Sequence, residues 1–185
     1  MWKQKLKSLE DNKQWDEAIT FMQDIINNNP HNKDVYIAMN FLLMNLLVEE
    51  DYDDNKHDMY AERLKEYFDT SYAQFSQSAE YLFYTGITAI MSEWYFGISH
   101  TEWSHMLQKA VHLEPNNILY QWGYFSSLNL DINNNKTVAK SYAQRIINKD
   151  PELFAELQKK GALGDYILDC MINWAKKVLE LYPYD

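Results

Sequence analysis

Apolar residues recur at intervals of three and four along most of this chain, which is the spacing that places them on one face of an α-helix. Residues 163–181 show the pattern most clearly, because Asp165 and Asp169 lie opposite a broad apolar face. That face consists of Leu163, Tyr166, Ile167, Cys170, Met171, Trp174, Val178 and Leu181.

The same criterion predicts helices from one end of the chain to the other. Only 5 Gly and 4 Pro are present, so the sequence has little material for the tight turns of a sheet. We therefore expect an all-α fold, in which Thr101 caps the start of one helix. The predicted helices cover residues 2–10, 14–29, 32–49, 57–70, 77–95, 101–113, 117–129, 136–149, 152–160 and 163–181.

Three segments of the chain align with one another without gaps: residues 23–30 (QDIINNNP), 108–115 (QKAVHLEP) and 144–151 (QRIINKDP). Each has the composition of a helix end followed by a stop, since proline disfavours the α conformation in the residue before it. The chain therefore contains an internal repeat of helical units.

The segment before the first of these prolines resembles the second helix of a tetratricopeptide repeat. In that family a small residue lets two helices approach closely, and a closing proline ends the helix; Ala18 and Pro30 match these positions. Ala139 and Pro151 match them in the last copy. Pro30 and Pro115 are 85 residues apart, against a family period of 34, so we expect one degenerate unit between them, with residues 56–71 as its second helix.

The resemblance implies a short right-handed solenoid of antiparallel helix pairs in a single domain, residues 1–185. The expected units are residues 1–30, 31–73, 74–115 and 116–151, followed by capping helices in 152–185, because the last open face of a solenoid needs a cap. The resemblance also implies a concave groove lined by the first helix of each pair. Most aromatic and aliphatic residues of those helices must be core, and some are candidate groove anchors: Tyr36, Ile37, Phe41, Tyr81, Phe83, Tyr84, Tyr120, Trp122 and Tyr124.

Negative charge is concentrated in the middle third of the sequence. The net charge is −10, and residues 41–102 hold twelve acids against three bases. Such a field repels phosphate backbones and anionic lipids, so we expect no nucleic acid and no membrane as ligand. A basic protein is the expected partner. The single cysteine and the absence of an apolar signal or membrane-length segment lead us to expect a cytoplasmic protein.

Four of these acids form a stripe on the predicted helix 57–70. Asp58, Glu62, Glu66 and Asp69 fall within about 80° of arc at 100° per residue. Like charges four residues apart destabilise a helix by about 0.2–0.5 kcal/mol per pair, so the stripe is either a solvated face or a docking surface for a cationic partner. The neighbouring loop adds further candidate contacts: Glu49, Glu50, Asp51, Asp53 and Asp54.

Groups that could support catalysis or metal binding are few. Cys170 lies on an apolar helix face, which raises a thiol pKa and argues against a nucleophile. Glu102 and His105 form a single Glu-x-x-His spacing, where a di-iron bundle needs two. The acidic loop lacks the Gly and the terminal Glu of a calcium-binding loop, and residues 161–164 (GALG) are a turn rather than a nucleotide loop. We therefore expect no catalytic residue, no metal and no cofactor.

Three classes of function follow from this pattern. The first is a non-enzymatic binder that neutralises a basic protein, such as an immunity protein against a nuclease-type toxin, whose RNA-binding surface is cationic. The second is a tetratricopeptide-type adaptor or secretion chaperone that holds a peptide in its groove. The third is a small helical enzyme. The salt dependence of the association rate distinguishes the basic-protein binder from the groove-binding adaptor, because charge-steered association slows steeply as ionic strength rises.

Overall fold

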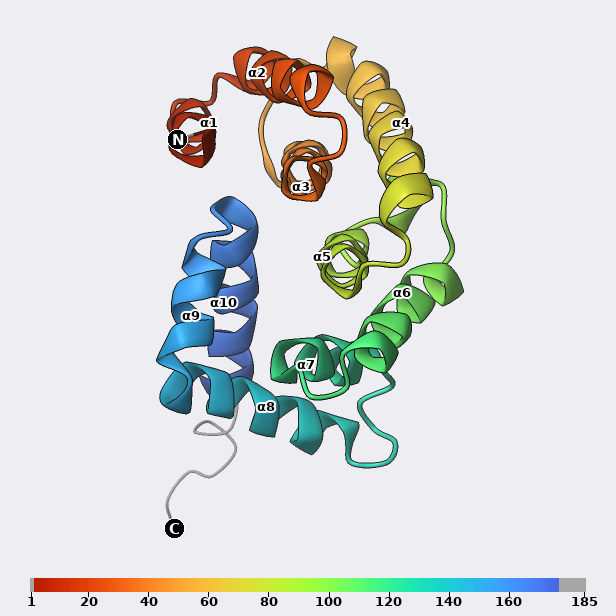
Figure 1. The fold of residues 1–185 in the computed structure, drawn as a ribbon, viewed down its shortest axis with the longest axis vertical. Helices are drawn as coiled ribbons and strands as arrows, with labels where there is room; N and C mark the ends of the chain where they lie inside the picture. The colour runs from red at the N-terminus through yellow and green to blue at the C-terminus, as the bar shows by residue number, and fades with distance from the viewer. Residues whose placement is uncertain (1, 177–185) are drawn as a thin grey trace. The chain divides into compact units, whose positions relative to one another are not determined.

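The computed structural model of the chain describes residues 2–176, and all regular structure in this range is helical (Figure 1). The described chain is therefore all-α, as the sequence predicts. Its α-helices are α1 (Trp2–Asp11), α2 (Trp15–Asn28), α3 (Lys33–Glu49), α4 (His57–Phe75), α5 (Ala79–Ala89), α6 (His100–Leu113), α7 (Ile118–Ser127), α8 (Asn135–Lys149), α9 (Pro151–Gln158) and α10 (Ala162–Lys176), with 3-10 helices η1 (Asp54–Lys56) and η2 (Glu93–Phe96).

Three differences between the predicted and the observed helix boundaries affect the region around α4. The predicted helix 77–95 ends at Ala89, and a 3-10 turn follows it. Helix α4 continues to Phe75, five residues beyond the prediction. Helix α6 starts at His100, so Thr101 lies inside it, and Ser99 occupies the capping position. The predicted residues 177–181 of the last helix, including Val178 and Leu181, lie outside the described residues.

The helices form two compact units, residues 1–113 and 114–185. This division falls close to the predicted boundary between the third and fourth repeats. In the first unit α3 packs against α2, α4 and α5, and α5 packs against α6. Figure 1 shows α3 and α5 almost end-on, with α2 and α4 alongside them. Helix α3 is buried over most of its circumference, which matches its nearly continuous apolar sequence.

Gly86 permits the close packing of α5 on α6. A Cβ atom at Gly86 would lie 2.9 Å from Leu107 Cδ2, so a larger residue would push α6 away. The predicted small-residue position of the first repeat is equally tight, because Ala18 on α2 is fully buried. Small residues thus lie at close helix contacts in this unit, and the division into repeat units stays a prediction.

In the second unit, α8 packs against α7, α9 and α10. Ala139 and Ala143 on α8 are fully buried. Gly161 ends the turn after α9 in the left-handed conformation, with φ +65°. Gly164 lies so close to α9 that a Cβ would fall 1.8 Å from the Leu157 carbonyl oxygen. The predicted turn is therefore confirmed only at Gly161, because Ala162, Leu163 and Gly164 already belong to α10.

The apolar face of α10 is packed, as its pattern predicts. Leu163, Ile167 and Met171 are buried, while Tyr166 and Trp174 are half-buried. Their neighbours are α8 and α9 of the same unit. Capping of a solenoid by this helix stays a prediction.

A polar cluster lies inside the apolar core of the first unit. Ser71 Oγ accepts a hydrogen bond from Asn40 Nδ2 at 3.3 Å and lies 2.7 Å from the hydroxyl of Tyr81. It donates its own proton to the backbone carbonyl of Tyr67, also at 2.7 Å. Because the Ser71 proton goes to that carbonyl, the Tyr81 hydroxyl donates to Ser71 Oγ, and burial raises the pKa of Tyr81. The cluster joins α3, α4 and α5.

The candidate groove anchors are mostly core residues. Among the nine, only Tyr124 keeps more than a small fraction of its surface exposed. No helix in the described part of the chain is long and apolar enough to span a bilayer.

Candidate protein-binding surface

The acidic stripe lies on the solvent side of α4. Asp58, Glu62, Glu66 and Asp69 are all exposed. On the opposite side of the same helix Tyr60, Leu64 and Phe68 are buried, and Tyr67 is half-buried. The helix therefore packs by its aromatic face and turns its carboxylates to solvent, as the sequence predicts.

Most of the stripe has no intramolecular counter-charge. Asp58, Glu62 and Glu66 make no ion pair or hydrogen bond through their carboxylates with any residue that the structure describes. Asp69 differs, because Lys65 Nζ binds its Oδ2 at 2.7 Å one turn earlier on the helix. Three of the four charges are thus left for solvent or a partner.

The acidic loop between α3 and α4 also contains both acids that bind a neighbouring residue and acids that are exposed to solvent. Glu50 pairs with Lys13 at 3.1 Å, and Asp53 Oδ1 accepts hydrogen bonds from the backbone and side-chain nitrogens of Asn55. Glu49, Asp51 and Asp54 are exposed. Within residues 2–176, no group of three or more His, Cys, Asp or Glu side chains converges in a way that would hold a metal ion.

Helix α4 is fixed at its amino-terminal end by Asp16 of α2. The hydroxyl of Tyr60 donates to Asp16 Oδ1 at 2.8 Å, and Lys56 Nζ binds the other carboxylate oxygen. These two hydrogen bonds lower the pKa of Asp16, that of Lys56 being the larger cause. Burial, together with the bond to Asp16, raises the pKa of Tyr60. The contact with Asp16 thus fastens the side of α4 that faces α2, and the acidic stripe lies on the solvent side of the helix.

A second anchor of α4 was not apparent from the sequence. The imidazole of His57 lies between two tyrosine hydroxyls, Tyr52 at 2.6 Å from Nδ1 and Tyr95 at 3.3 Å from Nε2. This cluster ties the acidic loop and η2 to the first turn of α4. Its three members are spread over more than forty residues, so no local spacing could have revealed it.

The 3-10 turn η2 also exposes a large aromatic side chain. Trp94 is 66% exposed, more than any other large hydrophobic residue described. Sequence analysis placed it near the end of a long helix, where an apolar run would have been core. Gly97 closes η2 with a positive φ, a conformation that glycine adopts readily, so this glycine is a local sequence signal that no helix continues through it.

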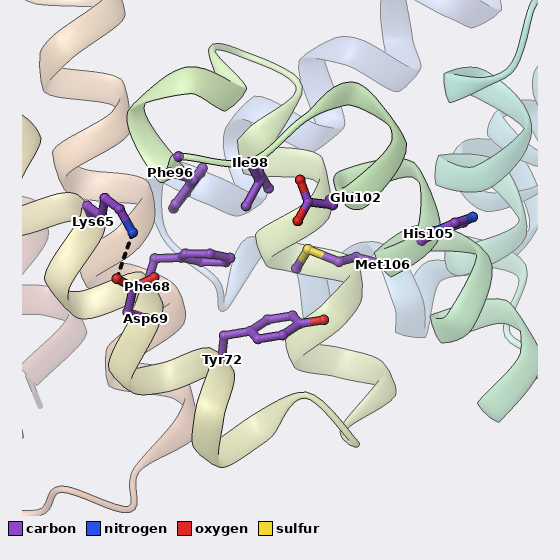
Figure 2. Close-up of a pocket in the computed structure, with 10 residues that line it drawn as sticks. Lys65, Phe68, Asp69, Tyr72, Phe96, Ile98, Glu102, His105 and Met106 are labelled. Atoms are coloured by element: carbon purple, nitrogen blue, oxygen red, sulfur yellow. Dashed lines mark hydrogen bonds and ion pairs between the residues drawn. The ribbon is translucent and has the colours of Figure 1, made fainter.

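Beside the stripe, α4, η2 and α6 surround a pocket of about 360 Å³ (Figure 2). Its lining combines apolar groups with charged groups from α4 and α6. Asp69 belongs both to this pocket and to the stripe. The lining residues are Lys65, Phe68, Asp69, Tyr72, Phe96, Gly97, Ile98, Glu102, His105 and Met106.

The Glu-x-x-His pair does not converge in this pocket. Glu102 Oε2 accepts hydrogen bonds from the backbone nitrogen of Ser99 at 2.7 Å and from its hydroxyl at 2.8 Å, which forms a capping box for α6. These bonds lower the pKa of Glu102. Figure 2 shows the imidazole of His105 directed away from Glu102. The two side chains therefore do not form a shared ligand set.

Cys170 on α10 is half-buried. Burial raises the pKa of its thiol, which a hydrogen bond with Tyr166 only partly offsets. The predicted direction of the shift is confirmed. A raised pKa leaves little thiolate at neutral pH, and the thiol is a poor nucleophile.

Comparison with known proteins finds similarity at the level of structure. No protein-family model matches the chain, and no curated protein sequence matches it. The chain is similar to a solved structure described as "Crystal structure of MamA protein", with 15% sequence identity and a TM-score of 0.46, over 97% of this chain and 88% of that one.

Proposed function

We propose that this protein is a non-enzymatic binding module that captures a basic protein through the acidic face of α4 and the adjoining loop. The observation that carries the proposal is the lack of counter-charges on three of the four residues of the stripe. Asp58, Glu62 and Glu66 are exposed, point away from the core and pair with no described residue.

Helix energetics support this proposal over a merely solvated face. Asp58, Glu62 and Glu66 follow one another at four-residue spacing, and each such like-charge pair destabilises a helix by about 0.2–0.5 kcal/mol. The helix tolerates this because Tyr60, Leu64 and Phe68 bury its other side. A row of carboxylates on a packed, rigid helix is preorganised for a cationic surface, and it also steers the encounter.

We further propose a nuclease-type toxin as the partner, with this protein as its immunity protein. A surface that binds RNA carries cationic side chains that contact phosphates. Carboxylates spaced along a helix can contact those cationic side chains in place of the phosphates. The support here is charge complementarity alone. A cytoplasmic location accords with this role.

The alternative is a tetratricopeptide-type adaptor or secretion chaperone that grips a peptide in a groove. The helix order and the buried alanines accord with such repeats. The candidate aromatic anchors are buried, which argues against peptide binding in a groove, since a side chain without exposed surface cannot contact a peptide. Of the candidates, Tyr124 alone keeps appreciable exposure.

A growth assay tests the proposed role. The toxin-like gene nearest to this gene would be expressed with the wild-type protein, with Glu62→Lys/Glu66→Lys, or with Asp24→Lys/Asp131→Lys. The third variant carries the same charge change on exposed residues that belong neither to α4 nor to its adjoining loop. We expect wild type and the control to restore growth and the stripe variant to fail. Equal protection by all three would contradict a role for the stripe. No protection by wild type would contradict immunity to that toxin.

A further inference from the structure

We propose that the pocket between α4, η2 and α6 receives the guanidinium side chain of an arginine from the partner protein. This inference rests on the proposed function and gives it a specific contact. It starts from the pocket's mixed lining, which has an apolar floor and a charged rim (Figure 2).

The floor suits the methylene stem of a long side chain. Phe68, Phe96 and Met106 are buried beneath it, and Ile98 is half-buried. A volume of about 360 Å³ corresponds to roughly a dozen water molecules at about 30 Å³ each, which is ample for one arginine side chain. Long basic side chains gain from such surfaces because their stems pack while the charged end stays polar.

The rim carries a surplus of negative charge. Lys65 and Asp69 neutralise each other at 2.7 Å. Glu102 remains, and its capping bonds to Ser99 occupy only Oε2. Because Oε1 bonds to no described residue, a full carboxylate charge faces the pocket without a cation. The pocket therefore favours a cationic occupant.

The aromatic wall favours arginine over lysine. The ring of Tyr72 is 39% exposed and lies against Phe68 at a centroid distance of 5.4 Å. Figure 2 shows Tyr72 and Glu102 on opposite sides of the pocket, with Phe68 and Met106 between them. A planar guanidinium stacks on an aromatic ring and still donates in its own plane to a carboxylate, which a compact ammonium group does not do.

The position of the pocket links it to the stripe. Asp69 closes the stripe and lines the pocket. A partner segment lying along Asp58, Glu62 and Glu66 would therefore reach the pocket at the end of that row. The stripe would supply long-range attraction, and the pocket would supply a fixed point of contact.

The inference is testable without the partner. N-acetyl-arginine amide would be titrated into the full-length protein while NMR follows the methyl groups of Ile98 and Met106. N-acetyl-lysine amide and the neutral isostere N-acetyl-citrulline amide serve as comparison ligands, all at equal ionic strength. We expect saturable shifts with the arginine probe, with Kd in the millimolar range, weaker binding of the lysine probe and no saturation with citrulline.

Conservative variants locate the site. Glu102→Gln keeps the capping box, since Gln also serves in that motif, and removes the charge; we expect about fivefold weaker binding. Tyr72→Phe should bind as wild type, whereas Tyr72→Ala should lose binding. Asp24→Asn removes an equal charge from an exposed residue of α2, outside both the stripe and the pocket, and should leave the affinity unchanged.

Three results would overturn the inference: no saturable shift of Ile98 and Met106, equal affinity for the lysine or citrulline probe, or equal loss of affinity in Asp24→Asn and Glu102→Gln. Each would leave the proposed function standing if the Glu62→Lys/Glu66→Lys variant still failed to protect cells. Conversely, suppose that the arginine probe binds at the pocket and that the Glu62→Lys/Glu66→Lys variant still protects cells fully. This result would refute the proposed role of the stripe and leave the arginine pocket standing.

Discussion

The hydroxyl of Tyr60 on α4 donates a 2.8 Å hydrogen bond to the carboxylate of Asp16 on α2. The two residues are 44 positions apart, and the bond fixes the rotation of α4 about its axis. Tyr60 lies on the buried side, with 1% of its surface exposed. The carboxylates of Asp58 and Glu62 are consequently held on the outside.

Replacing Tyr60 by Phe should therefore destabilise the protein without disturbing its packing. The variant loses a hydrogen bond to an ionised acceptor, and we expect a loss of about 1 kcal/mol at neutral pH, the low end for such bonds because Asp16 is largely exposed. Chemical denaturation of both proteins measures the difference. A variant as stable as wild type would show that the bond does not hold α4.

The pH dependence of that difference follows from the two shifted groups. The pKa of Asp16 is lowered in the folded protein, so its contribution is present above the ordinary carboxyl range and is lost as pH falls below about 4. The pKa of Tyr60 is raised, so its contribution is lost as pH rises above about 10. The stability gap should therefore narrow at both extremes. A gap that is constant with pH would contradict this assignment.

Ser71→Ala should be more damaging, because it removes the centre of the buried polar cluster. Asn40 Nδ2 and the Tyr81 hydroxyl would lose their shared partner in an apolar core. An unsatisfied buried polar group costs about 1–3 kcal/mol, and we expect a loss of about 2–3 kcal/mol in denaturant unfolding. Ser104→Ala on α6 is the control, and it should change stability by less than about 0.5 kcal/mol. Similar values for the two variants would rule out a structural role for the cluster.

Gly164→Ala should disrupt the second unit. Its new Cβ would overlap the Leu157 carbonyl, so α10 must move away from α9, and we expect a loss of at least about 2 kcal/mol. Gly161→Asn tests the glycine of the turn that precedes α10. It has open space around its Cβ position, and Asn tolerates its left-handed conformation. Thermal unfolding should separate the two variants clearly, and an intact Gly164→Ala protein would contradict the close approach.

Trp94→Ala should leave stability within about 0.5 kcal/mol of wild type, because the side chain is largely exposed. Trp is enriched among residues that dominate binding energy, and η2 packs against the helix that carries the stripe. We therefore expect weaker binding of the partner with unchanged unfolding. Isothermal titration calorimetry measures the affinity, and an unchanged Kd would exclude Trp94 from the interface.

The sequence predicted the helices and the exposed stripe well, because both follow from local spacing. Asp58, Glu62 and Glu66 had to share a face once α4 was helical, and Tyr60 and Leu64 had to lie opposite. The contacts that complete the surface are non-local. Tyr52, His57 and Tyr95 meet only after α3, α4 and η2 are packed. The pocket could not be predicted for a further reason. The apolar run from Trp94 to Phe96 has the pattern of a helix, whereas in the structure α5 ends at Ala89 and η2 follows it.

The central claim, that the acidic face of α4 binds a cationic partner, is tested most directly by association kinetics. Stopped-flow measurements would give the association rate of the partner with wild type, with Glu62→Lys/Glu66→Lys and with the Asp24→Lys/Asp131→Lys control, over a series of salt concentrations. We predict a wild-type rate that falls steeply with salt, a similar slope for the control, and a stripe variant that is slower at low salt and nearly insensitive to salt. Identical rates and slopes for wild type and the stripe variant would contradict the claim and favour the groove-binding adaptor.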